Sequence, residues 1–81
     1  MKHSAQLWPA ILKSLNRRSW TPLSAIYAGV AKRVVFDPDD FTPEAPHSTI
    51  PKWKRNVRNV LQRRKALGHV DWDRAASYKL P

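Results

Sequence analysis

The segment from Lys52 to Gly68 constrains the fold more than any other part of the chain. Its apolar residues recur at the spacing of a single helical face, and a glycine follows where such a helix would end. The segment therefore predicts an amphipathic helix from Lys52 to Leu67 that docks on a hydrophobic core. The predicted buried face is Trp53, Val57, Val60, Leu61 and Leu67, and the opposite face is Arg55, Arg58, Asn59, Gln62 and Arg63.

Positive charge is concentrated on this same segment. Seven basic residues and no acidic one lie between Lys52 and Lys65, whereas Asp37, Asp39, Asp40 and Glu44 crowd a different stretch. The whole chain carries 15 Lys and Arg against 6 acidic residues, a formal net charge of +9. Such a balance favours polyanionic partners, although a basic helix face that is merely solvated is the plainer alternative.

Two further helices are predicted upstream. Apolar residues at helical spacing predict the first from about Trp8 to Arg17, with Pro9 in its first turn. For the second, Thr21 is a suitable N-cap, Pro22 suits the first helical position, and the apolar stripe ends near Lys32 or Arg33. A very short strand at Ser19 and Trp20 is expected between them.

The stretch from Val34 to Pro51 contains four prolines and most of the acidic residues. It predicts a long ordered loop with one extended piece at Val34–Phe36. We expect its acidic residues to keep the loop solvated and away from phosphate. A nuclease centre built from these carboxylates lacks a supporting sheet and a suitably placed lysine.

Beyond Gly68 the hydrophobic period changes to two, with Val70 and Trp72 alternating against polar neighbours. A hairpin is therefore predicted, with its turn at Arg74-Ala75-Ala76 and Tyr78 packed beneath it. Three helices and a C-terminal β-hairpin wing predict an α+β, mainly α, winged helix-turn-helix in one domain over residues 1–81. Three tryptophans are expected in its core: Trp8, Trp20 and Trp72.

Several classes of protein fit the sequence poorly. The chain has no cysteine for disulfides or thiolate zinc sites, and the three histidines are scattered. We therefore expect no metal, no cofactor and no enzymatic activity. Without an apolar run long enough to span a bilayer, or a signal peptide, the expectation is a cytoplasmic monomer that does not contact membranes.

The predicted partner is double-stranded DNA, read in the major groove by the helix from Lys52. Guanidinium and amide groups pair with base edges, and Arg55, Asn56, Arg58 and Asn59 supply them. Phosphates would be met by Lys52, Lys54, Arg63 and Lys65, and by Arg74 on the wing. One of Ser48 and Thr49 is expected to cap the helix and the other to touch DNA. Trp53 is expected in the core, with contact to a base methyl group as the alternative.

The spacing Pro51-x-Trp53-x-x-x-Val57-Arg58-x-x-Leu61-Gln62, then Gly68 and Tyr78-x-Leu80, resembles the winged-helix domains of methyl-directed, DpnI-like restriction endonucleases. Trp8-x-x-Ile11-Leu12 and Leu23-x-x-x-Tyr27 extend the resemblance over nearly the whole chain. It implies a reader of GATC methylated on adenine in both strands, either free-standing or joined to a nuclease domain. The residues it points to are Ser48, Thr49, Trp53, Arg55, Asn56 and Asn59. Arg64 departs from the pattern, because relatives tend to place leucine there in the core register.

Two other functions remain open from sequence. One is a winged-helix transcription regulator that reads unmethylated DNA. The other is a protein interaction module whose acidic loop meets a partner, with a basic helix that is incidental. The second predicts DNA affinity of only non-specific strength, which collapses as salt rises.

Overall fold

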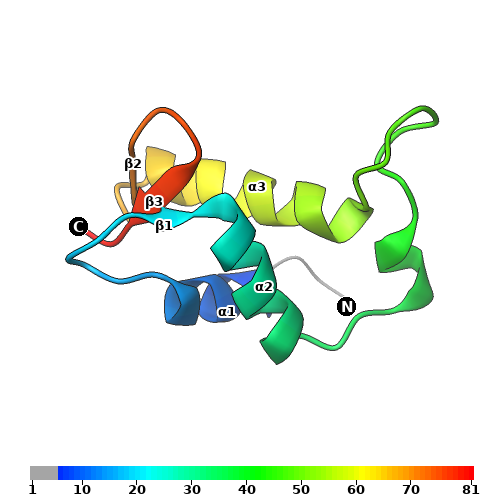
Figure 1. The fold of residues 1–81 in the computed structure, drawn as a ribbon, viewed down its shortest axis with the longest axis horizontal. Coiled ribbons are helices and arrows are strands. Elements are labelled where there is room, and N and C mark those ends of the chain that lie inside the picture. Colours follow the sequence, from blue (N-terminus) through cyan, green and yellow to red (C-terminus); the bar gives the residue numbers. More distant parts are fainter. Residues whose placement is uncertain (1–5) are drawn as a thin grey trace.

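The computed structural model describes residues 6–81, in which helices and a small antiparallel sheet alternate (Figure 1). The predicted α+β, mainly helical class is confirmed. The elements in chain order are α1 (Leu7–Ser14), β1 (Thr21–Pro22), α2 (Leu23–Arg33), the 3-10 helix η2 (Pro38–Phe41), α3 (Lys52–Ala66), β2 (Asp71–Trp72) and β3 (Ser77–Lys79).

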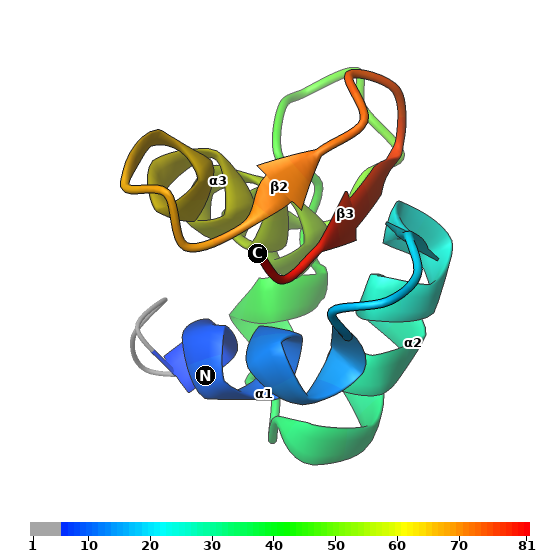
Figure 2. The same ribbon diagram turned by 90° about the vertical axis from the view of Figure 1, so that its left-hand side faces the viewer.

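The sheet pairs the segment before α2 with the C-terminal hairpin. Its strand order is β1-β3-β2, and both pairings are antiparallel. Tyr78 of β3 lies opposite Thr21 on one side and Trp72 on the other. Figure 2 shows β2 and β3 between α3 and the start of α2. The predicted hairpin is therefore confirmed, and β1 adds a third strand to it.

The core lies where the three α-helices meet the sheet. Its largest fully buried side chains come from α1, α2 and α3: Leu7, Ile11, Ile26, Val30, Val57 and Leu61. Trp53 and Val60 complete the buried face of α3 as predicted, and Tyr78 is buried beneath the hairpin, also as predicted. The placement of Leu67 in this face was wrong, because its side chain is 60% exposed. Leu67 is the C-cap, and Gly68 with φ of 79° turns the chain away there.

α1 ends three residues before the predicted Arg17. Leu15 adopts an extended conformation, and the side-chain Oδ1 of Asn16 accepts hydrogen bonds from the backbone N–H groups of Arg18 and Ser19. An asparagine side chain that bonds the backbone ahead of it offers the chain a turn in place of further helix. This local competition explains the early end.

α2 starts later than predicted, and Thr21 is not its N-cap. Thr21 and Pro22 are extended and pair with β3, so Pro22 occupies the N-cap position and Leu23 is the first helical residue. The Leu23 backbone N–H donates to the Ala76 carbonyl oxygen at 2.7 Å. Pairing with a strand more than fifty residues away therefore overrides the local capping signal, and it also moves the expected strand from Ser19–Trp20 to Thr21–Pro22.

Val34–Phe36 forms no strand. Phe36 instead packs against the Trp53 and Phe41 rings, with centroid separations of 4.9 Å and 5.7 Å. The long loop is ordered by η2 and by an antiparallel bridge between Pro43 and Pro51. Aromatic packing on α3 replaces strand pairing in this stretch.

The tryptophans divide between core and surface. Trp8 is half-buried, whereas Trp20 is 44% exposed and Trp72 is 36% exposed, so placing Trp20 and Trp72 in the core was wrong. Each indole is covered by a cation: Lys79 Nζ lies 5.0 Å from the Trp20 ring and Lys65 Nζ 4.3 Å from the Trp72 ring. Cation–π contacts suit aromatic side chains that remain at the surface.

Candidate nucleic-acid interface

α3 lies between two loops that rise on the same side of it. The β2–β3 turn stands near its C-terminal half, and the loop over residues 42–51 stands near its first turn (Figures 1 and 2). The helix therefore presents its outer face with a projection at each end. Between them, little more than one helical turn contributes the exposed side chains of Asn59, Gln62 and Arg63.

Asn59 and Arg63 are four residues apart, so they are neighbours on one side of the helix. Their side chains form no hydrogen bond or ion pair with any other described residue, and the same holds for Gln62. The side-chain amides of Asn59 and Gln62 and the guanidinium of Arg63 are thus available to an external partner. The sequence predicted the exposure of all three correctly.

Arg58 is engaged by the loop that precedes the helix. Its Nη2 donates to Glu44 Oε2 at 2.8 Å, with the Arg58 side chain 38% exposed and the Glu44 side chain 21% exposed. Sequence reasoning placed Arg58 on the outer face but missed its partner. No local sequence pattern indicates an ion pair between residues fourteen positions apart. The pair forms only when the loop folds onto α3.

Lys52 has an acidic neighbour from the same loop. Its Nζ lies 3.4 Å from Asp39 Oδ1, on a carboxylate that is largely exposed. The acidic stretch therefore contacts the first turn of the basic helix, which sequence reasoning did not indicate. The Pro43–Pro51 bridge and the backbone bond from Lys52 N–H to the Thr42 oxygen fold this stretch back onto the first turn of α3.

Neither Ser48 nor Thr49 caps α3, contrary to prediction. Pro51 is the N-cap residue, and no side chain bonds the first-turn amides. Ser48 Oγ instead accepts from the Ile50 backbone N–H at 3.0 Å and donates to Glu44 Oε1 at 3.4 Å. Ser48 is thus part of the loop's own bonding, whereas Thr49 is exposed.

Arg55 and Asn56 are half-buried near the start of the helix. Arg55 Nη2 donates to Asn56 Oδ1 at 3.3 Å, so the two predicted base-reading groups bind each other. Among the described residues, the Nε atoms of Arg55 and Arg58 are buried without an acceptor. An unsatisfied buried donor costs about 1–3 kcal/mol, which favours rearrangement when an acceptor arrives.

Trp53 and Lys54 occupy the groove between α2 and α3. The Trp53 ring is buried against Tyr27, with centroids 5.6 Å apart, and Lys54 Nζ lies 5.1 Å from the Tyr27 ring centroid. Core packing of Trp53 is therefore confirmed. Lys54 is drawn toward α2, on the flank of α3 rather than on its outer face.

The core-register position on the last turns of α3 belongs to Arg64. Its guanidinium carbon lies 4.5 Å from the Trp8 ring centroid, and Nη1 lies 3.0 Å from His69 Nδ1. The long side chain thus covers α1 in place of an apolar residue and keeps its charge at the surface. The sequence singled out Arg64 as unusual but did not indicate this contact.

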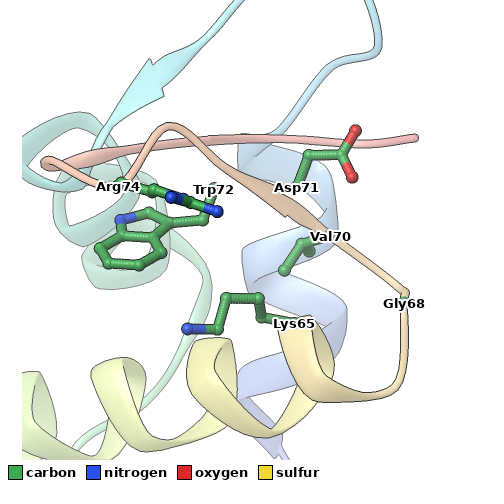
Figure 3. A pocket seen from close by; sticks show the side chains of 6 residues that line it. All are labelled: Lys65, Gly68, Val70, Asp71, Trp72 and Arg74. Carbon is green, nitrogen blue, oxygen red and sulfur yellow. The ribbon is translucent and has the colours of Figure 1, made fainter.

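A pocket of about 660 Å³ opens between the end of α3 and the hairpin (Figure 3). Lys65 and Trp72 are in contact and line it together, and Arg74 stands at the hairpin turn. Trp72 Nε1–H donates to the Ala75 oxygen at 3.3 Å, which fixes the indole against the turn. Arg74 has φ of 64°, which is uncommon for a non-glycine residue and holds the turn in a left-handed conformation. Lys65 and Arg74 therefore bring two cations to one open surface.

Two tyrosines lie close to Arg58. Burial raises the pKa of Tyr27 and of Tyr78, and the positive charge of Arg58 opposes the rise in both cases. Asp73 adds to the rise for Tyr78, and Glu44 adds to it for Tyr27. Both hydroxyls therefore stay neutral over the ordinary pH range.

In residues 6–81, no three histidine or acidic side chains are grouped so as to hold a metal ion. None of the helices described is both long enough and apolar enough to cross a bilayer. Comparison with models of known protein families, with curated protein sequences and with solved structures finds no significant match.

Proposed function

We propose that this chain is a winged-helix module that binds double-stranded DNA with α3 in the major groove. The observation that carries the proposal is the arrangement of α3: a 15-residue helix without acidic residues, with its outer face open and a hairpin turn beside it. The element order α1-β1-α2-α3-β2-β3 and the strand order β1-β3-β2 support the winged-helix assignment. An α-helix fits the major groove, where each base pair presents a distinct pattern of donors and acceptors.

Bases would be read by the exposed groups of α3. Asn59 and Gln62 carry amides able to make paired hydrogen bonds to adenine, and Arg58 carries a guanidinium suited to guanine. Arg63 and Lys52, on the flank of the helix, would contact phosphates, together with Arg74 and Lys65 at the hairpin. Arg55 and Asn56 would have to exchange their mutual hydrogen bond for one to DNA.

The first target to test is GATC methylated on adenine in both strands, because of the resemblance to methyl-directed endonuclease domains. Thr49, which is exposed beside the first turn of α3, offers a methyl group for an apolar contact with methyladenine. Trp53 is a poorer candidate, since its ring is committed to the core. Methyl recognition therefore depends on the loop before α3.

Binding should be measured by fluorescence anisotropy with labelled duplexes carrying GATC in fully methylated, hemimethylated and unmethylated form, at one salt concentration. Tighter binding to the methylated duplex supports the methyl reader. Specific binding that ignores or disfavours methylation supports a regulator that reads unmethylated DNA. Equal and weak affinity for all three, and for unrelated duplexes, would contradict both.

Two variants test the geometry. Asn59→Ala should cost about 1–3 kcal/mol of discrimination between sequences if it reads a base. Arg63→Ala should weaken binding to all duplexes and reduce the salt slope by about 1. Lys13→Ala, which removes an exposed cation from α1, is the matched control and should leave discrimination unchanged.

One observation favours a second candidate, a protein interaction module. Val35 is 87% exposed and Phe41 is 60% exposed, both in the stretch between α2 and α3. Exposed apolar side chains on a loop are common at protein contacts. This candidate predicts that Val35→Ser and Phe41→Ser abolish partner capture while DNA binding stays weak and non-specific.

A further inference from the structure

We propose that Glu44 sets the sequence specificity of α3 by holding Arg58 through one nitrogen and repelling phosphate from it. This inference rests on the proposed DNA-binding function and adds a role for the acidic loop. It assigns to Glu44 a part in selecting among DNA sequences, although the side chain bears the same sign of charge as DNA.

The backbone around Glu44 fixes where its carboxylate lies. Glu44 N–H donates to the Ile50 oxygen at 2.8 Å, and the bridge between Pro43 and Pro51 closes the loop at its base. Ser48 Oγ donates to Oε1, leaving Oε2 for Arg58. The carboxylate is mostly buried and is therefore presented to α3 in a defined position, unlike the exposed carboxylate of Asp39.

The ion pair uses only part of the Arg58 guanidinium. Glu44 bonds Nη2 alone, and Nη1 has no hydrogen-bond or ion-pair partner among the described residues. Arginine has five N–H donors in a planar fork. The contact through Nη2 restrains the guanidinium beside Glu44 and leaves Nη1 and the second Nη2 hydrogen for a base, while Nε is buried. An arginine held in this way loses less side-chain entropy when it meets a base.

The charge of Glu44 acts differently on phosphates and bases. Non-specific affinity comes from cations that neutralise phosphates, and a carboxylate 2.8 Å from Arg58 cancels most of that attraction. Hydrogen bonding to a base edge depends on donor geometry, which the ion pair preserves. Glu44 thus weakens binding to unmatched duplexes and spares binding to a matched one. It is a repulsive element that raises discrimination.

The test compares Glu44→Gln with wild type on two labelled 24-base-pair duplexes. One duplex is selected by wild-type protein from a randomised pool, and the other has random sequence. Glu44→Gln should bind random duplex about 5-fold more tightly, with a salt slope steeper by about 0.9, the value for one added phosphate contact. Affinity for the selected duplex should stay the same or fall, so the ratio between the two drops at least 5-fold.

Asp39→Asn removes the same charge from the same loop but frees Lys52 in place of Arg58. Because Lys52 is placed at phosphates, this variant should tighten both duplexes by the same factor and keep their ratio. A second control is Arg58→Ala combined with Glu44→Gln. In the Arg58→Ala background the effect of Glu44→Gln on the salt slope should vanish.

Three results would overturn the inference while leaving DNA binding intact. They are an unchanged ratio in Glu44→Gln, an equal drop in the ratio for Asp39→Asn, and an effect of Glu44→Gln that persists without Arg58. A merely structural role for Glu44 would lower thermal stability and weaken both duplexes together. If wild type selects no sequence and binds no duplex, the proposed function itself fails.

Discussion

Arg64 illustrates how one residue combines structural and surface roles. It lies on the core side of α3, where the resemblance leads one to expect leucine, and its guanidinium covers the Trp8 ring of α1. A basic residue there keeps the last turns of the helix charged without interrupting the contact between α1 and α3. The sequence marked the position as unusual, but only the placement of Trp8 and His69 explains it.

Arg64→Ala should lower the free energy of unfolding by about 1 kcal/mol, through loss of the cation–π contact and of the packed side-chain stem. Arg64→Leu should cost less, because leucine also covers Trp8. Urea denaturation of both variants checks this order. A larger loss in Arg64→Leu than in Arg64→Ala would mean that charge, not coverage, is what the site requires.

Burial of Tyr78 makes the stability of the fold depend on pH in the alkaline range. Burial, reinforced by Asp73, raises the pKa of Tyr78 above its ordinary value of 10.0, so the folded chain favours the neutral phenol more than the unfolded chain does. The stabilisation is complete below pH 10 and is lost as the pH rises through the raised pKa. Unfolding free energies should therefore decline above pH 10, and Tyr78→Phe should decline less steeply. The same decline in both proteins would exclude this cause.

At the scale of elements, the α1–α2 crossing depends on Gly29. A Cβ built at this position would clash with Ser14 Oγ and lie 3.0 Å from Ser14 Cβ, so the two helices meet too closely for a side chain. Ser14 Oγ is itself bonded to the Ala10 carbonyl oxygen at 3.0 Å. The close approach fixes how α2 sits against α1, and through the core how α3 is held.

Gly29→Ala should therefore destabilise the fold by about 1–3 kcal/mol, the range for overpacking. Adding Ser14→Gly should recover part of the loss, because it removes both crowding atoms. Thermal or urea denaturation of the single and double variants provides the comparison. Strict additivity of the two substitutions would show that they do not meet at this crossing.

Gly68 ends α3 in a left-handed conformation, and a Cβ built there meets no atom within 4 Å. Only the strain of the backbone conformation therefore opposes a side chain at this position. Gly68→Ala should cost about 1 kcal/mol and Gly68→Asn less, since asparagine tolerates this conformation better. Denaturation curves for the two variants test the ranking. Equal stability of wild type and Gly68→Ala would contradict the account of this helix end.

The sequence predicted the elements better than their ends. The amphipathic pattern of α3 and the glycine after it were sufficient to predict that helix and its buried face up to Leu61. Local signals failed where distant pairing intervened, as at Thr21, which joins a strand with Tyr78 instead of capping α2. In the candidate site, exposure of Asn59 and Arg63 followed from helical period, whereas the Glu44 contact required the folded loop.

At the scale of the whole molecule, charge and shape act together. The net charge of +9 favours polyanions in general, and seven of the basic residues lie on α3. The acidic loop offsets charge near the first turns, while Arg63 and the hairpin cations remain available. Specific recognition is therefore expected along the middle of α3, at Arg58, Asn59 and Gln62, and phosphate contacts at Lys52, at Arg63 and at the hairpin.

The most direct test of α3 as a DNA-reading helix is chemical-shift mapping of the ¹⁵N-labelled protein during titration with duplex DNA. We expect the largest side-chain and backbone shifts at Asn59, Gln62 and Arg63, with further shifts at Arg74 in the hairpin turn. Residues of α1 such as Lys13 should change little. Shifts confined to Val35, Phe41 and the α2–α3 groove, or spread evenly over all exposed lysines, would contradict it.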